Sequence, residues 1–162
     1  MKSKENILVV WPNDQENRQR SAYAAANSDF VPGTACVRVN NLLVACDTDT
    51  ALHKTLPVEF VWIDGSTRHD VNLIDKDGNT VQQYTTIQGP MIAEVAVGRF
   101  TAPPEAGDVI TKSATAGSLD PLNATELDAL LTANLDDITL VIGRVIGVAE
   151  KSGSGFVLCK FD

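Results

Sequence analysis

Short apolar runs rich in β-branched residues alternate with polar turns along most of the chain. Runs of this length and composition, bounded by Gly, Pro, Asn and Asp, are typical of β-strands. Turn signals recur roughly every eight to twelve residues, a spacing typical of an antiparallel sandwich or barrel. The pattern predicts single strands over residues 7–11, 58–63, 91–100, 109–111 and 156–161.

Two pairs of runs are predicted to form hairpins. Asn40-Asn41 divides the segment 34–46 into two β-like halves, and Asp77-Gly78 lies between the alternating runs 71–75 and 80–86. Asn, Asp and Gly accept the positive φ angles that tight hairpin turns require. The second pair is the clearer hairpin, because its residues alternate in type on both sides of the turn.

Glycines interrupt two of the longer apolar runs. The run Ile138–Glu150 is β-branched and contains Gly143 and Gly147. This composition predicts a strand that is buried on both faces and bends or bulges at its glycines. Gly98 is a possible bulge in the strand 91–100. The segment 113–123 between two strands has the composition of a loop.

One short helix is expected over residues 125–133. Leu127, Leu130 and Leu131 share a face of such a helix, and Asn123 or Thr125 can cap its N-terminus. The alanine-rich segment 14–27 could be a second short helix or an extended arm. The expected fold is therefore all-β, an antiparallel β-sandwich or β-barrel with one short helix and an N-terminal arm.

The acidic charge of the chain limits its partners. The formal net charge is -8 and the sequence pI is near 4.6. Such a surface repels nucleic acid and anionic lipid, and no run approaches the ~20 apolar residues of a membrane span. We therefore expect neither a nucleic-acid nor a membrane partner. The basic residues near the N-terminus either contact an acidic partner or form a solvated end; they are Lys2, Lys4, Arg18 and Arg20.

The residue types that carry chemistry occur without the spacing that catalysis or metal binding needs. Three cysteines lie in separate apolar runs and form no CxxC pair, so we expect small buried hydrophobes and a reducing compartment. Three polar groups were weighed as sites, and in each case a polar loop or turn explains the residues better. These groups are Asp47, Asp49 and His53 for a metal, Ser66, His69 and the acids Asp64 and Asp70 for a triad, and 75–79 for calcium. We expect no enzyme activity, cofactor or metal.

The C-terminal half contains a recognisable sequence pattern, in which glycines interrupt and separate β-like apolar runs. It comprises GDVITKSATAGSLDPLN, residues 107–123, and VIGRVIGVAEKSGSGFVLCKF, residues 141–161. This pattern resembles that of tailed-bacteriophage capsid decoration proteins, also called cement or head-stabilising proteins, which have small β-barrel or β-tulip domains. The resemblance covers roughly residues 90–162.

The resemblance implies a division of the chain and a role for it. Residues 1–30 would be an N-terminal arm or strand-exchange segment, 31–89 a β-rich lobe, and 90–162 the decoration-protein-like β-barrel domain. A protein of this family is a structural virion protein that binds the outer capsid surface and bridges neighbouring capsid subunits. Its partners would be the major capsid protein and its own copies, as a homodimer or homotrimer. It would be assembled in the host cytoplasm and lie on the capsid exterior.

The N-terminal strand and the residues after it are the candidate contacts. An exposed apolar strand can add to the sheet of a neighbour through backbone hydrogen bonds, but the same run can also be the first strand of its own sheet. The candidate oligomer or capsid contacts are Ile7, Leu8, Val9, Val10, Trp11, Arg18, Arg20 and Tyr23. The alternatives are a tail or baseplate module and a carbohydrate-binding β-module, for which Trp11 and Trp62 are the aromatic candidates.

Overall fold

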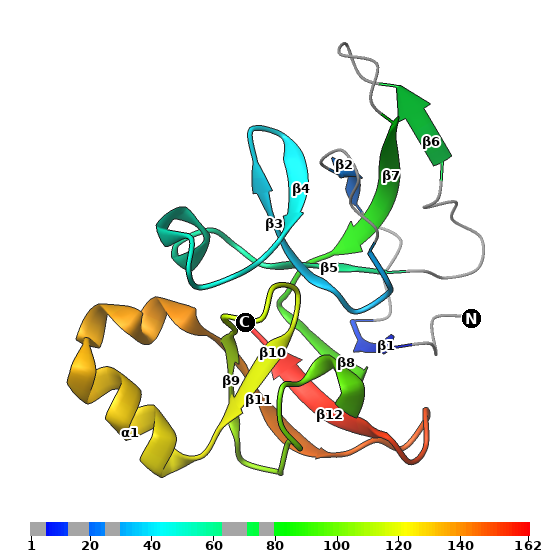
Figure 1. Ribbon diagram of the computed structural model, residues 1–162. Helices are drawn as coiled ribbons and strands as arrows, with labels where there is room; N and C mark the ends of the chain where they lie inside the picture. The colour runs from blue at the N-terminus through cyan, green and yellow to red at the C-terminus, as the bar shows by residue number, and fades with distance from the viewer. Residues whose placement is uncertain (1–5, 13–19, 25–29, 63–70, 75–79) are drawn as a thin grey trace.

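The strands of the chain form two six-stranded sheets that pack on one another (Figure 1). The computed structural model describes residues 6–12, 20–24, 30–62, 71–74 and 80–162, with side chains described outside 71–74 and 80–82. The all-β class with a barrel and one short helix is confirmed.

The first sheet, here called the C-terminal sheet, is antiparallel throughout. Just after β8, Phe100 makes a parallel bridge with Leu119 of β10, so the sheet curls back toward itself. Its strands, in spatial order, are β1 (Ile7–Trp11), β8 (Met91–Ala96), β12 (Phe156–Phe161), β11 (Val141–Val148), β9 (Val109–Lys112) and β10 (Leu119–Leu122).

The second sheet, here called the barrel sheet, closes into a ring of five strands. Closure comes from β2, which pairs in parallel with β4 and antiparallel with β7. The ring strands, in spatial order, are β2 (Arg20–Ala24), β4 (Leu42–Ala45), β3 (Ala35–Val39), β5 (Glu59–Val61) and β7 (Thr80–Ile87), and β6 (Val71–Ile74) pairs with β7. The closed barrel therefore lies in residues 20–87, whereas we expected it in residues 90–162.

The expected segments map onto the two sheets only in part. The chain passes from the barrel sheet to the C-terminal sheet between β7 and β8, which brackets the expected boundary between residues 89 and 90. Residues 1–30 do not behave as one segment, because their described strands β1 and β2 belong to different sheets. The barrel sheet is thus inserted between the first and second strands of the C-terminal sheet.

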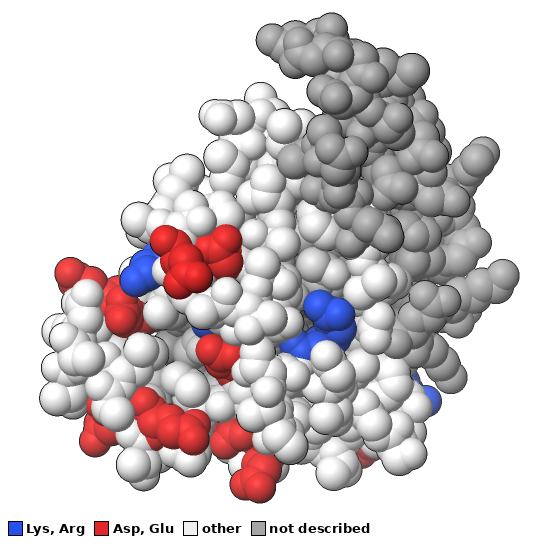
Figure 2. All heavy atoms as spheres, in the orientation of Figure 1, with Lys and Arg blue, Asp and Glu red and all other residues white. Residues whose placement is uncertain are grey.

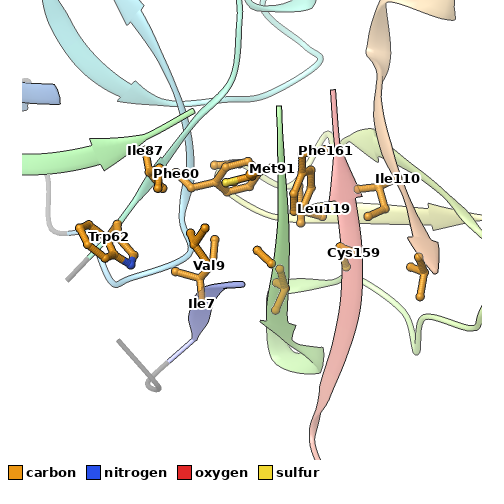
Figure 3. Close-up of a cluster of buried hydrophobic side chains, with 14 of the residues drawn as sticks. Ile7, Val9, Phe60, Trp62, Ile87, Met91, Ile110, Leu119, Cys159 and Phe161 are labelled. Carbon is orange, nitrogen blue, oxygen red and sulfur yellow. The ribbon is translucent and has the colours of Figure 1, made fainter. Parts of the chain in front are cut away.

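Two apolar clusters stabilise this arrangement. The larger lies between the sheets, where the rings of Phe60 and Phe161 are 4.7 Å apart (Figure 3). Ile7 and Val9 of β1 belong to this cluster and are buried. The smaller fills the barrel and includes Tyr84, and it is made of Ala22, Ala24, Cys36, Leu43 and Val61 with Phe30 packed against it.

The hairpin predicted around Asn40-Asn41 is confirmed. Antiparallel β3 and β4 meet there, and the φ angles of the two asparagines are 52° and 65°. Both angles are in the left-handed region, which asparagine tolerates better than most residues and which matches the twist of the paired strands. Strands β6 and β7 also pair as predicted, but their turn at 75–79 lies outside the described residues.

The chain between β10 and β11 forms a helical excursion at one side of the molecule (Figure 1). It contains α1 (Ala124–Ala133) and the 3₁₀ helix η4 (Leu135–Leu140). Of the two residues predicted as caps, Asn123 is the one that caps α1, in a capping box with Glu126. None of the ten helical residues of α1 is buried, so the helix packs loosely on the sheet.

Three local predictions were wrong. Gly98 lies in the 3₁₀ helix η3 (Val97–Arg99) and forms no bulge. The expected loop 113–123 contains β10, an edge strand that accommodates Pro121. Strand β11 is not buried on both faces, because Arg144 and Ile146 are exposed, although its register does shift next to Gly143 and Gly147 as expected.

Candidate contact surfaces

Strand β1 is the first strand of its own chain's C-terminal sheet. It pairs with β8 in the register Ile7↔Val95, Leu8↔Glu94 and Val9↔Ala93. Ile7, Leu8 and Val9 are buried against their own chain, so in this arrangement their side chains do not face a partner. Exposing these side chains would cost about 1.5–3 kcal/mol each in lost apolar burial.

The end of β1 remains accessible. Val10 is half-buried, and Trp11 is 52% exposed. Trp11 borders a shallow recess of about 220 Å³ that is otherwise lined by Pro90, Met91, Ile92, Lys160 and Phe161. Of the candidate contacts on β1, Trp11 is therefore the one that a partner can reach.

The candidates on β2 have different roles. Tyr23 is 43% exposed, whereas Arg20 directs its guanidinium toward Glu59 of the same barrel at 3.6 Å. Arg18 lies outside the described residues. Tyr23 thus remains a surface candidate, while Arg20 is engaged within its own chain.

Glu59 is the centre of a buried polar cluster that the sequence analysis missed. The Nε and Nη2 atoms of Arg38 donate to its two carboxylate oxygens at 2.6 and 3.0 Å, and the Thr86 hydroxyl donates at 2.7 Å. Burial raises the pKa of Glu59, but these hydrogen bonds and the charges of Arg38 and Arg20 outweigh it and lower that pKa below its usual value. The cluster joins four strands of the ring: β2, β3, β5 and β7.

A second buried carboxylate organises the turn between β11 and β12. Glu94 accepts hydrogen bonds from the backbone N–H groups of Glu150, Lys151 and Ser152. Burial raises the pKa of Glu94, but these hydrogen bonds more than offset this effect and lower it. Both buried carboxylates are fully engaged in holding the fold.

Lys112 of β9 connects the two sheets. Its ammonium group donates to the backbone carbonyl oxygens of His53, Lys54 and Leu56 at 2.8, 2.9 and 2.8 Å. These carbonyls belong to the 3₁₀ helix η2 (Ala51–Lys54) and the residues after it, between β4 and β5. Burial lowers the pKa of Lys112.

The residues weighed as metal or nucleophilic sites do not form one where they are described. The Asp47 backbone N–H donates to His53 Nδ1, and no group of three His, Cys, Asp or Glu in the described part of the chain could hold a metal ion. Burial raises the pKa of the Cys159 thiol to about 12 and raises that of Cys36 further, and Cys46 is also buried. The residues Ser66, His69 and Asp70, and the segment 75–79, lie outside the described residues.

The hollows of the described surface lie near or below the lower end of ligand-pocket sizes, from about 220 Å³ to about 320 Å³. One of about 250 Å³ lies between the sheets, where Phe60, Gln88 and Phe161 line it. Pockets that enclose a drug-sized ligand usually have ~300–1,000 Å³. Trp62 is buried in the core between the sheets, so it cannot stack on a sugar.

Large exposed apolar side chains occur at separate places on the molecule. Val148 at the end of β11 is 79% exposed, and Ile146 nearby is also exposed. On η4, Leu135 is 71% and Ile138 50% exposed. Exposed apolar side chains that gather in patches mark contact surfaces more often than single ones do.

Charge is unevenly distributed on the view shown in Figure 2. Acidic side chains gather over the side of the molecule that carries α1 and η4, and basic ones are fewer there. Among the described residues, no helix is long and apolar enough to cross a membrane.

In comparisons with protein-family models, with curated proteins and with solved structures, nothing matched the chain.

Proposed function

We propose that this chain is a structural virion protein that binds the outer surface of a tailed-phage capsid and stabilises it by bridging neighbouring capsid subunits. The observation that carries the proposal is that accessible apolar side chains lie at separate places on the fold, and two of these places are proposed as the contacts. One is Trp11 with its recess, and the other is the exposed pair Leu135 and Ile138 on η4. A bridging protein needs two such surfaces, because it must contact two neighbours at once.

The segments that resemble decoration proteins support the proposal by their place in the fold. Residues 107–123 contain β9 and β10, and residues 141–161 contain β11 and β12. These strands are contiguous in the order β12-β11-β9-β10. The sequence pattern that resembles decoration proteins therefore corresponds to one continuous piece of sheet and not to scattered turns.

The polar groups with perturbed pKa values support a structural role. Glu59, Glu94 and Lys112 are all buried, and each is engaged by partners within the chain. Perturbed groups at an active site usually face a cleft. Lys112 does line two hollows, but here all three groups are held by partners within the chain and hold strands and turns together.

The proposal is tested by adding purified protein to capsids of the phage that encodes it, after the native copies have been stripped off. We expect saturable co-sedimentation and a rise in the temperature at which the capsids break. Trp11→Ala should weaken binding, whereas Val31→Ala, which also shortens an exposed apolar residue, serves as the matched control. Light scattering of the free protein would distinguish monomer, homodimer and homotrimer.

Other outcomes would assign the chain elsewhere. Co-purification with tails and absence from capsids would favour the tail or baseplate alternative. Binding to a glycan array that is lost in Trp11→Ala would favour the carbohydrate-binding alternative, since Trp62 is buried. Either result, together with failure to bind capsids, would overturn the proposed function.

A further inference from the structure

The helical excursion exposes two large apolar side chains on a single ridge. In a 3₁₀ helix, residues three apart lie above one another. Leu135 and Ile138 of η4 are such a pair and are 71% and 50% exposed, whereas Asp137 and Leu140 form another pair that is mostly covered. Leu135 and Ile138 therefore share the exposed side of η4, and Asp137 and Leu140 share its covered side.

The 3₁₀ helix η2, which also carries an exposed apolar side chain, lies next to η4. Lys54 of η2 lies 3.7 Å from Asp137 of η4, so the two 3₁₀ helices are adjacent. Leu52 of η2 is also exposed. We use the name α1–η4 face for the surface made of Leu52, Leu135, Ile138 and the exposed residues of α1, Asp128 among them.

A hollow of about 320 Å³ opens beside α1 and η4. Leu122, Leu130 and Leu140 provide its apolar lining, and Asp120 and Glu126 add carboxylates. Lys112 also lines this hollow, but its ammonium group is held by three backbone carbonyls of the η2 region. The α1–η4 face therefore has a raised apolar ridge and an adjacent recess that could receive a side chain.

All the charged side chains in the sequence segment that contains α1 and η4 are negative. Residues 113–143 contain five acidic residues and no Lys, Arg or His. Asp137 is paired with Lys54, while Asp128 and Asp136 are exposed. The same stretch on a second copy would oppose carboxylates to carboxylates, so contact between identical faces is disfavoured.

We infer that the α1–η4 face is the docking site for a basic segment of the capsid protein that carries large apolar side chains between Lys or Arg residues. The inference rests on the proposed function for the identity of the partner. Apolar side chains of the segment cover Leu135 and Ile138, and its cations lie against Asp128 and Asp136. Complementary charge sets the orientation and the rate of association, and apolar contact slows dissociation.

The test compares four variants for binding to stripped capsids. Leu135→Ser/Ile138→Ser removes the ridge, and Val148→Ser is its control because it removes an equally exposed apolar side chain on β11. Asp128→Asn/Asp136→Asn removes two charges, and Glu105→Gln/Glu150→Gln, at two other exposed acids, is the matched control. We expect the ridge variant to bind about tenfold more weakly or worse. The Asp128/Asp136 variant should bind capsids more weakly, and its affinity should depend less on salt concentration. The affinity of both controls should stay within about twofold of that of the parent.

Failure of this inference is distinguishable from failure of the proposed function. If the parent binds capsids and the ridge and charge variants bind equally well, the docking site is elsewhere while the function stands. If the parent does not bind capsids, the face is tested with a peptide of alternating lysine and leucine that is acetylated only at its N-terminus. Binding of this peptide is observed by NMR of the isotope-labelled full chain. Chemical-shift changes confined to Leu52 and residues 124–140, and absent in the ridge variant, would support it. Changes spread over other strands, or unaltered in that variant, would overturn it.

Discussion

At the scale of single residues, Glu59 holds together the polar cluster inside the barrel. Glu59→Gln removes the buried carboxylate and leaves the partly buried Arg38 without its counter-charge, while the exposed Arg20 remains solvated, so the loss should lie at or below the lower end of the range for a fully buried pair. Removing one partner of a fully buried ion pair typically costs about 3–5 kcal/mol. We therefore expect the free energy of unfolding, measured in urea at neutral pH, to fall by at most about 3 kcal/mol, while Glu105→Gln at an exposed site changes it little.

The same substitution should change how stability depends on pH. The folded chain holds the pKa of Glu59 below its usual value of 4.5, so the unfolded chain takes up the proton first as the pH falls. Glu59 therefore stabilises the fold fully above about pH 4.5, and this contribution is lost as the pH falls through the folded pKa. Glu59→Gln should lose less stability than the parent over that acidic range; equal slopes for the two proteins would contradict the assignment.

Lys112 tests whether a buried cation can be held by carbonyl groups. Lys112→Met keeps the length of the side chain but leaves the carbonyls of His53, Lys54 and Leu56 without their donor. A buried polar group that loses its partner costs about 1–3 kcal/mol, so the melting temperature should drop clearly. Hydrogen exchange at residues 51–56 should also accelerate. Lys160→Met, at an exposed position of β12, is the control, and unchanged exchange in Lys112→Met would show that η2 is held by other contacts.

The polar cluster shows why such sites escape sequence reasoning. Arg38, Glu59 and Thr86 each look like ordinary polar positions on half-buried strands, and Arg20 looks like part of a basic end. They come together because β2, β3, β5 and β7 close into one ring. Local pattern carries no information about which strands will be neighbours in such a ring, so neither the cluster nor the engagement of Arg20 could be predicted.

At the scale of elements, β11 contains two glycines that differ in the space available for a Cβ atom. A Cβ at Gly143 would collide with the carbonyl oxygen of Lys160 and with Phe161, whereas nothing lies within 4 Å of a Cβ at Gly147. Forcing extra atoms into a packed site usually costs about 1–3 kcal/mol. Gly143→Ala should therefore lower the free energy of unfolding measurably, and Gly147→Ala should leave it nearly unchanged. Similar losses for the two variants would refute the close approach of β11 to β12.

Helix α1 should be able to unfold on its own. Asn123→Ala removes the capping box, which typically costs about 1 kcal/mol. Because no residue of α1 is buried, this loss should fall on the local opening of residues 124–133 and not on global stability. Hydrogen exchange should speed up within the helix, while the melting temperature stays nearly constant. Thr125→Ala, at an exposed position inside the helix, is the control; a large drop in melting temperature for Asn123→Ala would mean that α1 is part of the cooperative core.

Elements whose sequence signal lies within a few residues of chain were predicted correctly, and elements that depend on distant contacts were not. The β3–β4 turn and the cap of α1 were predicted because Asn40, Asn41 and Asn123 meet a conformational requirement within a few residues of chain. Strand β10 was missed because Pro121 is typical of loops, and only its place at a sheet edge makes it compatible with a strand. The burial of β11 was overestimated because an apolar run alone does not show which face is covered.

At the scale of the whole molecule, the place of the first strand is the feature that sequence could not decide. The apolar run of β1 fits an exchanged arm and an intrachain strand equally well. The choice depends on whether Ile7 and Val9 find a partner surface in their own chain, and Phe60, Trp62 and Met91 provide it. The candidate contacts consequently shrink to Trp11 and Tyr23 among those described, and the exposed residues of η4 join them.

The shared core between the sheets predicts that they unfold together. Phe161 of the C-terminal sheet packs on Phe60 of the barrel sheet, and both are buried. Replacing a buried phenylalanine by alanine typically costs about 3–5 kcal/mol, because apolar contact is lost and a cavity remains. In Phe161→Ala, hydrogen exchange should therefore accelerate in β3 and β5 as well as in β11 and β12, and denaturation should remain a single transition. Phe156→Ala, at a partly exposed position of the same strand, should have a smaller effect. If exchange accelerates only in the C-terminal sheet, then the two sheets are separate cooperative units, and a domain boundary near residues 89 and 90 would be a true boundary of folding.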